Sequence, residues 1–347
     1  MEYFYGLLIH TIMCRLILLS SILILASGCR QGVVFHNHTG LTQGTTFNIV
    51  FQERAFISPD RIKSEIDLRL VEIDMSLSVY NSESLISAIN RNEPVKIDSM
   101  FAGVFRLSEK ISEMTGGLFD ITVGPLVRAW GFGPDSQERY DPMKADSLLS
   151  LVGYKKIRIS DGMVLKENPG MRLDLNAVAQ GYSVDVICSL LDDFGISNYL
   201  VEIGGEVRVS GMRDDRLWRV GVDSPSESGL LPGEKLAAVI ELSDEALATS
   251  GNYRKFFTGE DGVKYSHTID PVTGRPARNR LLSATIVAPD AATADAFATA
   301  CMVAGPEKAI GFIESYGFLE GFLIFSGDTG EYLTWFSEGL KGRLQQE

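Results

Sequence analysis

The stretch Arg172–Gly211, RLDLNAVAQGYSVDVICSLLDDFGISNYLVEIGGEVRVSG, joins a long helical pattern to strand patterns. Its first half predicts a helix from about Asn176 to Phe194, which ends at Gly195. Its second half, NYLVEIGGEVRVSG, is rich in β-branched residues and predicts strands. A helix followed directly by strands that pair through hairpins indicates an α+β fold and not a strictly alternating parallel sheet.

The rest of the chain repeats this mixture, without internal repeats and without a linker that divides two domains. Asp161-Gly162 is the strongest short hairpin signal, since Asp-Gly between apolar residues favours a tight turn. Helix starts are marked by Ser58-Pro59 and by Asp290. The predicted elements are a first strand over 44–51, helices beginning at 58 and covering 101–114, 290–303 and 306–316, a strand over 281–288, and hairpins through 161–162 and 328–330.

Composition narrows the class of protein. The chain has 347 residues and 45% hydrophobic content, which is ample for a packed core. Its formal charge is −13 and it has no basic run, so a nucleic-acid partner is excluded on electrostatic grounds. The four cysteines have no metal-type spacing, and Cys188 and Cys301 sit in apolar helical patterns that predict buried free thiols.

The N-terminus carries a targeting signal. Residues 13–29, MCRLILLSSILILASGC, place one arginine before an apolar run, and small residues before Cys29. This resembles a bacterial lipoprotein signal, in which the cysteine becomes the first mature residue and carries lipid. An uncleaved transmembrane helix is the alternative, because apolar residues continue back to Tyr3, and Met13 is an alternative start. We expect a signal peptide over 1–28, a lipidated Cys29 and polar tether over 29–43, and one domain over 44–347.

Two acidic segments contain glycine and apolar neighbours. In GGLFDITVGPLVRAWGFG, Gly116–Gly133, the glycines bring the backbone close to a flat or anionic ligand, or simply end a helix and form turns. Asp120 lies there between Phe119 and Ile121, where a carboxylate needs a donor or a ligand. Asp174 precedes a helix that Asn176 could cap, so it complements the helix N-terminus or faces a polar ligand.

Two later segments complete the set. In PDAATADAFATACMVAG, Pro289–Gly305, Asp295 and Thr299 are spaced i, i+4 and share one helix face. Their oxygens suit a hard cation such as magnesium, although a solvent-facing Asp and a Thr bonded to its own helix fit the same spacing. In KYSHTIDPVTGRPARN, Lys264–Asn279, His267 is the single histidine of the expected domain, and is either a chemical group or a structural histidine at a turn.

Common catalytic signatures are absent: no phosphate-binding G-x-x-x-x-G-K-[ST], no G-x-G-x-x-G after a strand, no H-E-x-x-H and no G-x-S-x-G. In their place, the segments GGLFDITVGPLVRAWGFG, LDLNAVAQGY, EIGGE, ATSGNY, HTIDPVTGRP and DAFAT occur in this order. Together they resemble the ApbE family of flavin transferases from about Gly44 to Thr299. The resemblance implies a single α+β domain, related to the T-fold, with antiparallel sheets and packed helices.

The resemblance also implies a reaction and a site. Members use FAD as substrate: magnesium holds the pyrophosphate, a threonine hydroxyl of an acceptor protein attacks the FMN phosphorus, and AMP leaves. His267 is then a base or orients the hydroxyl, with Asp270 or Asp120 as alternatives. Gln43 stands where the family often has methionine, and Gln180 where charged residues are common. The implied metal ligands are Asp295, Thr299 and the Ala177 carbonyl, and the implied FAD contacts are Tyr80, Leu118, Phe119, Asp120, Asp174, Gln180 and Ile269.

Two other activities fit the same residues. With water as nucleophile, the site would be a magnesium-dependent FAD pyrophosphatase that gives FMN and AMP; with an idle metal site, the chain would be a flavin-binding lipoprotein without catalysis. The sequence does not separate them. The resemblance places the protein on the periplasmic side of a bacterial inner membrane, lipid-anchored, with subunits of membrane redox complexes as acceptors.

Overall fold

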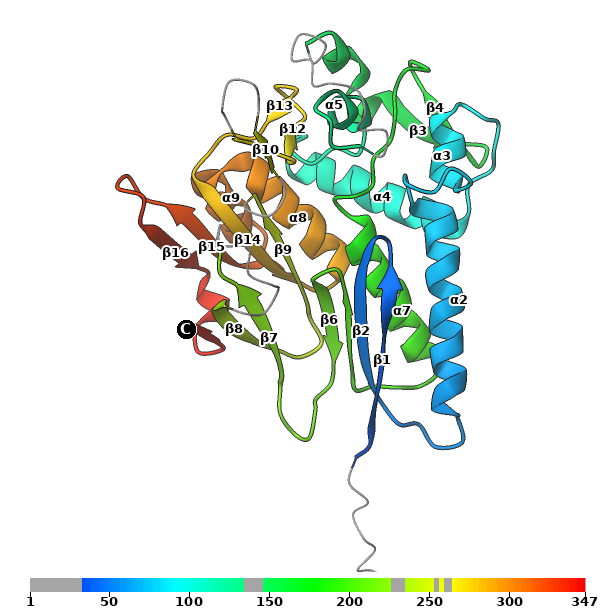
Figure 1. The fold of residues 1–347 in the computed structure, drawn as a ribbon, viewed down its shortest axis with the longest axis vertical. Coiled ribbons are helices and arrows are strands. Elements are labelled where there is room, and N and C mark those ends of the chain that lie inside the picture. The colour runs from blue at the N-terminus through cyan, green and yellow to red at the C-terminus, as the bar shows by residue number, and fades with distance from the viewer. Residues whose placement is uncertain (1–32, 134–145, 226–234, 253–255, 259–263, 347) are drawn as a thin grey trace, which may run out of the picture. The chain divides into compact units, whose positions relative to one another are not determined.

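An eight-stranded sheet forms the centre of the fold in the computed structural model, which describes residues 33–133, 146–225, 235–252, 256–258 and 264–346 (Figure 1). Every pair of neighbouring strands in it is antiparallel. In spatial order the strands are β1 (Phe35–Thr42), β2 (Thr45–Gln52), β5 (Tyr199–Ile203), β6 (Glu206–Ser210), β9 (Ala246–Gly251), β14 (Leu281–Ala288), β15 (Glu320–Ser326) and β16 (Tyr332–Phe336).

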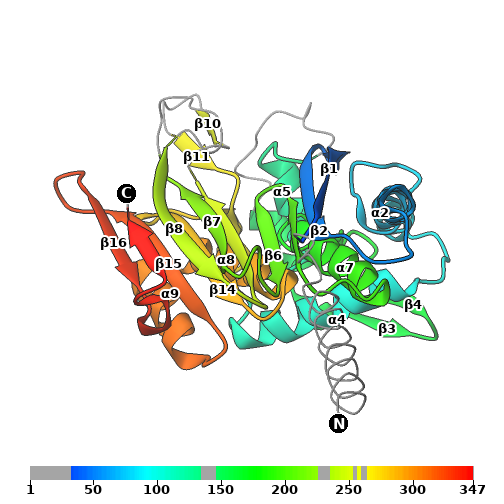
Figure 2. The same cartoon turned by 90° about the horizontal axis from the view of Figure 1, so that it is seen from below.

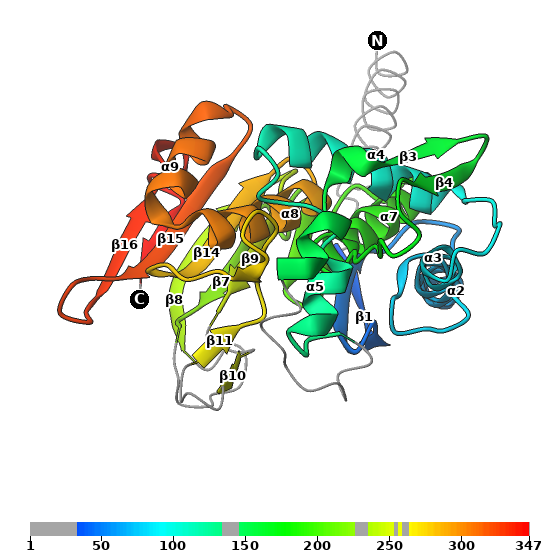
Figure 3. The same cartoon turned by 90° about the horizontal axis from the view of Figure 1, so that it is seen from above.

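Helices cover one face of this sheet, and α8 is the most buried of them. It consists almost entirely of small and apolar residues, so it packs on all sides, against β9, β14, α4, α7 and α9 (Figure 3). This packing joins the sheet and the helices into one core. The helices are α2 (Pro59–Leu77), α3 (Leu85–Asn90), α4 (Ser99–Met114), α5 (Gly124–Ala129), α7 (Ala179–Asp193), α8 (Ala291–Ala304) and α9 (Pro306–Ser315).

A smaller sheet of three strands packs on the other face of the large sheet (Figure 2). Its order is β17 (Leu344–Gln346), β8 (Leu236–Leu242), β7 (Trp218–Asp223). Buried and exposed residues alternate along β7, and Trp218, Val220 and Val222 pack against apolar residues of the large sheet. Three further hairpins are β3 (Ile157–Ser160) with β4 (Met163–Lys166), β10 (Phe256–Thr258) with β11 (Lys264–Ser266), and β12 (Ile269–Asp270) with β13 (Arg275–Pro276).

The N-terminal boundary of the fold differs from the expected one. The tether expected over 29–43 is wrong from residue 35 onward, because Phe35–Thr42 forms β1 and pairs along its whole length with β2. A two-residue turn, Gln43-Gly44, joins them, with φ of 50° and 73° as such tight hairpins require. Polar contacts support this edge strand, since His38 Nε2 lies 2.7 Å from Asp67 on α2.

Most other elements confirm the predictions, including the α+β class, α4, α8, α9, the Asp161-Gly162 hairpin and the buried free thiols of Cys188 and Cys301. The predicted cap of α7 is wrong: the helix begins at Ala179, and Val178 at the N-cap makes no side-chain hydrogen bond. In the part of the chain that the structure describes, no helix has the length and apolarity needed to cross a bilayer. The predictions for 1–28 and Cys29 lie outside the described residues.

Candidate active site

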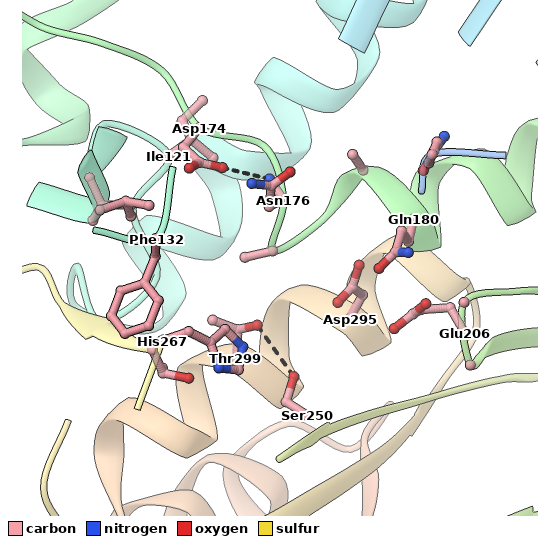
Figure 4. Close-up of a pocket in the computed structure, with 18 of the residues that line it drawn as sticks. Ile121, Phe132, Asp174, Asn176, Gln180, Glu206, Ser250, His267, Asp295 and Thr299 are labelled. Carbon is pink, nitrogen blue, oxygen red and sulfur yellow. Dashed lines mark hydrogen bonds between the residues drawn. The ribbon is translucent and has the colours of Figure 1, made fainter. Parts of the chain in front are cut away.

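A cleft of about 1,710 Å³ brings the predicted site residues together (Figure 4). Its walls come from loops after α2 and α4, from the start of α7, from α8, and from strands of both sheets. Asp270 is the one predicted residue of the FAD, metal and catalytic sets that does not line it. Those that do are Tyr80, Leu118, Phe119, Asp120, Asp174, Ala177, Gln180, His267, Ile269, Asp295 and Thr299.

Asp295 and Thr299 project from α8 into the cleft (Figure 4). Asp295 is only 5% exposed, so it is not a solvent-facing residue. Burial raises its pKa to about 7; the charge of Asp185 adds to this rise, and a hydrogen bond from the Gly181 N–H to Oδ2, at 3.2 Å, opposes it. Thr299 Oγ1 lies 3.4 Å from Ser250 Oγ on β9. The helix therefore presents a carboxylate and a hydroxyl, as its spacing predicts.

The donor set of this corner of the cleft fits a hard cation. The Asp295 carboxylate is buried, and among the described residues no lysine or arginine pairs with it. A divalent cation would compensate that charge, with the Thr299 hydroxyl and the Ala177 carbonyl as further oxygen ligands. The described residues contain no cluster of three His, Cys, Asp or Glu side chains that could hold a metal. The remaining ligands of a cation here would thus come from substrate phosphate or water.

The position of α8 depends on its contact with α7. Gly181 faces α8 so closely that a Cβ there would lie 2.3 Å from the Ala291 carbonyl oxygen. One turn later, the Asp185 carboxylate accepts hydrogen bonds from the N–H groups of Ala291 and Ala292, at 3.0 and 2.9 Å. Arg208 on β6 pairs with the same carboxylate, Nη1 to Oδ1, at 2.7 Å. These contacts hold the N-terminal end of α8, and with it Asp295, against α7.

His267 also lines the cleft, in a loop with several anchors. The Trp130 indole N–H donates to the Gly274 carbonyl at 2.8 Å, which ties the WGFG segment to the turn that follows the histidine. Ile269 packs with Trp130 in a small apolar cluster. The rings of Phe132 and His267 meet edge to face, with centroids 6.4 Å apart. The loop therefore holds the imidazole at the cleft wall (Figure 4).

Asp270 belongs to that turn and does not line the cleft, and its expected catalytic role stays a prediction. Its Oδ1 accepts the Val272 N–H at 2.8 Å, and its Oδ2 accepts the Thr273 hydroxyl at 2.9 Å. Its carbonyl also accepts the Gly274 N–H at 2.8 Å. Both carboxylate oxygens are therefore used within the turn, as aspartates commonly are. Asp270 supports the His267 loop from outside the cleft.

Asp120 and Asp174 accept hydrogen bonds from backbone N–H groups, and Asp120 also accepts one from a hydroxyl. Asp120 accepts the Thr122 N–H and hydroxyl at Oδ1, at 2.8 and 2.6 Å, and the Tyr154 N–H at Oδ2, at 2.8 Å. Asp174 accepts the Asn176 N–H at 2.9 Å. Burial raises the pKa of each carboxyl, and these hydrogen bonds oppose the rise. Both residues line the cleft and order its loops, so Asp120 is poorly placed to act as the base.

Several polar lining residues were not expected to act at the site. Asn176, Ser250 and Glu206 lie beside predicted residues, and Gln43 Nε2 donates to Ser183 Oγ at 2.5 Å. Ser250 and Glu206 lie in the segments ATSGNY and EIGGE, which are among those that resemble the ApbE family. That resemblance was the feature of the sequence that could have identified them. Their place beside α8 depends on strand pairing between distant segments, which the segments alone do not specify.

The fold and the cleft define a class: a single α+β domain in which a buried carboxylate and a hydroxyl, suited to a cation, line a cleft large enough for an extended ligand. The family model described as the ApbE family matches residues 43–323, and the chain belongs to that family.

The chain is similar to known flavin transferases over most of their length. The chain is 37% identical to an FAD:protein FMN transferase of Vibrio cholerae, covering 86% of this chain and 90% of that protein. It is 36% identical to that of Escherichia coli K12, covering 82% of each. The solved Flavin Transferase ApbE from Vibrio cholerae is similar at 34% identity with a TM-score of 0.78, covering 89% of this chain and 99% of that one. The apo flavinyl transferase ApbE of Pseudomonas stutzeri gives a TM-score of 0.79 at 27% identity, covering 90% and 97%.

Proposed function

We propose that this protein transfers the FMN moiety of FAD to a threonine hydroxyl of an acceptor protein, with release of AMP, in a magnesium-dependent reaction. The observation that carries the proposal is that one cleft contains both the Asp295–Thr299 face of α8 and His267. The names of the relatives support the FAD and protein substrates. Magnesium is supported by the buried, uncompensated carboxylate beside a hydroxyl.

The chemistry follows from these positions. Asp295, Thr299 and the Ala177 carbonyl would hold magnesium, which supplies positive charge to the pyrophosphate when it is bound. The acceptor hydroxyl oxygen forms a bond to the FMN phosphorus, the pyrophosphate P–O bond breaks toward AMP, and the imidazole of His267 takes the hydroxyl proton. Trp130 and Asp270 hold the loop that places the imidazole. Asp120 and Asp174 order the facing walls.

The test separates transfer from hydrolysis and from mere binding. The purified protein is incubated with FAD, magnesium and an acceptor that carries a flavinylation motif. Covalent flavin on the acceptor in equal amount to AMP supports transfer. Free FMN in equal amount to AMP identifies a pyrophosphatase, and flavin binding without AMP identifies a carrier.

His267→Ala tests the proposed base. We expect FAD binding to persist while transfer falls by roughly a hundredfold or more, the range for loss of a general base. His36→Ala is the matched control. His36 lies on the edge strand β1, where it pairs with Glu53, and it does not line the cleft. Full transfer by the His267→Ala protein contradicts the assignment.

We further propose that the protein is anchored by lipid on Cys29 to the periplasmic side of a bacterial inner membrane. The support is the sequence of residues 13–29, in which a short apolar run precedes small residues and the cysteine. Acceptors would then be subunits of membrane redox complexes that face the same compartment. An anchor of this kind keeps enzyme and acceptor at one surface.

A further inference from the structure

Strand β7 forms part of the cleft wall through its outer edge. In the spatial order of the small sheet, β7 comes last, and in the described part of the chain it pairs with β8 alone. Gly221, Val222 and Asp223, at its C-terminal end, line the cleft. An edge strand that borders a reaction cleft is a ready template for another extended chain.

The register of the small sheet shows which peptide groups face outward. The Glu241 N–H on β8 donates to the Arg343 carbonyl on the β17 side, at 2.9 Å. Because peptide groups alternate along an antiparallel strand, Ile240 faces β7, and its partner Val220 is bonded to β8. The alternation then directs the N–H and carbonyl of Gly221 away from β8. The backbone of Gly221 thus faces outward at the cleft.

Glycine suits this position for a close approach. A Cβ at Gly221 would lie 2.9 Å from the end of the Leu236 side chain on β8, so glycine leaves room for that neighbour. Glycine in a strand also marks places where another backbone can approach closely. The turn Gly204-Gly205 also lines the cleft, and Gly204 packs so closely on Gln180 that a Cβ would lie 2.4 Å from its Nε2. This glycine-rich part of the wall contains none of the residues expected to contact FAD except Gln180 at its border.

The cleft is large enough to hold a second ligand beside FAD. Its volume of about 1,710 Å³ exceeds the range of about 300–1,000 Å³ that is usual for one small ligand. The residues expected to contact FAD and metal lie on loops, on β12, on α7 and on α8, which leaves the β7 wall for another ligand. A protein acceptor must bring a chain segment into this space for its hydroxyl to react.

We propose that the acceptor segment binds as an extended strand added to the outer edge of β7 at Gly221. The proposal rests on the proposed transferase function and names how its protein substrate is held. Main-chain hydrogen bonds to β7 give the segment its binding energy, and alternate side chains of the added strand point to opposite sides, so one of them carries the hydroxyl into the cleft.

Gly221→Pro tests this directly, because proline removes the outward N–H without breaking a bond to β8. We expect the KM for the acceptor to rise about tenfold or more while FAD binding is unchanged. Arg219→Pro is the matched control: Arg219 faces the same edge two residues earlier, but does not line the cleft.

A second measurement avoids any folding defect by changing the acceptor. Peptide acceptors carrying the flavinylation motif are N-methylated at single positions and offered to the wild-type protein. Strand addition predicts that methylation at alternate positions abolishes labelling, whereas the intervening positions tolerate it. Equal tolerance at all positions, or an unchanged acceptor KM for a folded Gly221→Pro protein, overturns the inference. Lack of transfer by the wild type to the unmodified peptide would instead contradict the proposed function.

Discussion

Asp295 is the residue at which stability and function conflict most clearly. Its carboxylate is buried beside apolar residues of α8, and burial raises its pKa to about 7. Ionisation is therefore costly in the metal-free protein, and a bound cation would favour the ionised form. A side chain whose charge the fold opposes is a good candidate for function, because packing alone does not explain it.

Asp295→Asn tests that conflict. Asparagine keeps the shape but cannot carry the charge, so we expect AMP release to fall by about a hundredfold or more and its magnesium dependence to weaken. The unfolding midpoint at pH 8 should stay the same or rise, since a buried charge is removed. Asp290→Asn is the control, because asparagine also caps helices. Unchanged AMP release across a magnesium titration would refute the metal assignment.

The spacing of Asp295 and Thr299 could be predicted from the sequence, since helix geometry alone places i and i+4 on one face. The role of Asp270 could not. Its segment, H-T-IDP, indicated a site, but both carboxylate oxygens are used by the Val272 N–H and the Thr273 hydroxyl in the folded turn. A sequence shows that an aspartate lies near a histidine, but not which donors satisfy it first.

Among the secondary-structure elements, the contact between α7 and α8 controls the geometry of the site. Gly181 allows the two helices to approach, and its N–H bonds Asp295. Asp185, one turn further along α7, accepts two N–H groups from the first turn of α8. The acidic face of the site is therefore built by one helix and positioned by the other.

Gly181→Ala should disturb this contact. The new Cβ would lie 2.3 Å from the Ala291 carbonyl oxygen, which is backbone and cannot rotate away. We expect the free energy of unfolding to fall by about 1–3 kcal/mol, the usual cost of overpacking. Transfer should weaken further, because Asp295 moves with α8. Denaturant unfolding checks the first effect, with Gly311→Ala as control, since a Cβ there meets no atom within 4 Å.

Asp185 makes stability depend on pH. Burial, with the nearby charge of Asp290, raises its pKa from 3.8 to about 6, against the opposing effect of Arg208. A carboxyl whose pKa is higher in the folded state contributes stability below pH 4 that is lost as the pH rises through 6. We expect the stability of the wild type relative to Asp185→Asn to decline by roughly 2–3 kcal/mol between pH 4 and pH 7.

Urea unfolding of both proteins at several pH values measures this difference. Subtracting the two curves removes the contribution of other carboxyl groups that titrate in the same range. A difference that stays constant from pH 4 to pH 7 would show that Arg208 and the helix N-terminus fully compensate the buried charge.

Strand β1 shows where element prediction failed. Its residues, FHNHTGLT, are polar and lack a continuous apolar face, because β1 is an edge strand and only partly covered. Its stability comes from pairing with β2 and from contacts such as His38 with Asp67, which a local pattern does not record. The apolar elements α8 and β14 were predictable because burial dictates their composition.

In the whole domain, two sheets and a helical layer meet around one cleft, and each wall has a separate task. Helix α8 and the segment before α7 supply the proposed cation ligands, the loops around Trp130 hold His267, and the edge of β7 is the proposed acceptor site. The order of these segments was readable from the sequence. Their convergence was not, since it depends on pairing between strands far apart, such as β9 with β14.

The proposed anchor makes a prediction about where the protein is found in the cell. Cys29→Ala removes the lipid attachment point while leaving the body from Phe35 onward unchanged. We expect the variant to leave the membrane fraction and to label a soluble acceptor peptide at the wild-type rate. With an acceptor embedded in the same membrane, labelling should slow at least tenfold, because anchoring raises the effective concentration of the two partners. Fractionation and labelling of both acceptors measure this, and a variant that stays in the membrane would favour an uncleaved N-terminal helix.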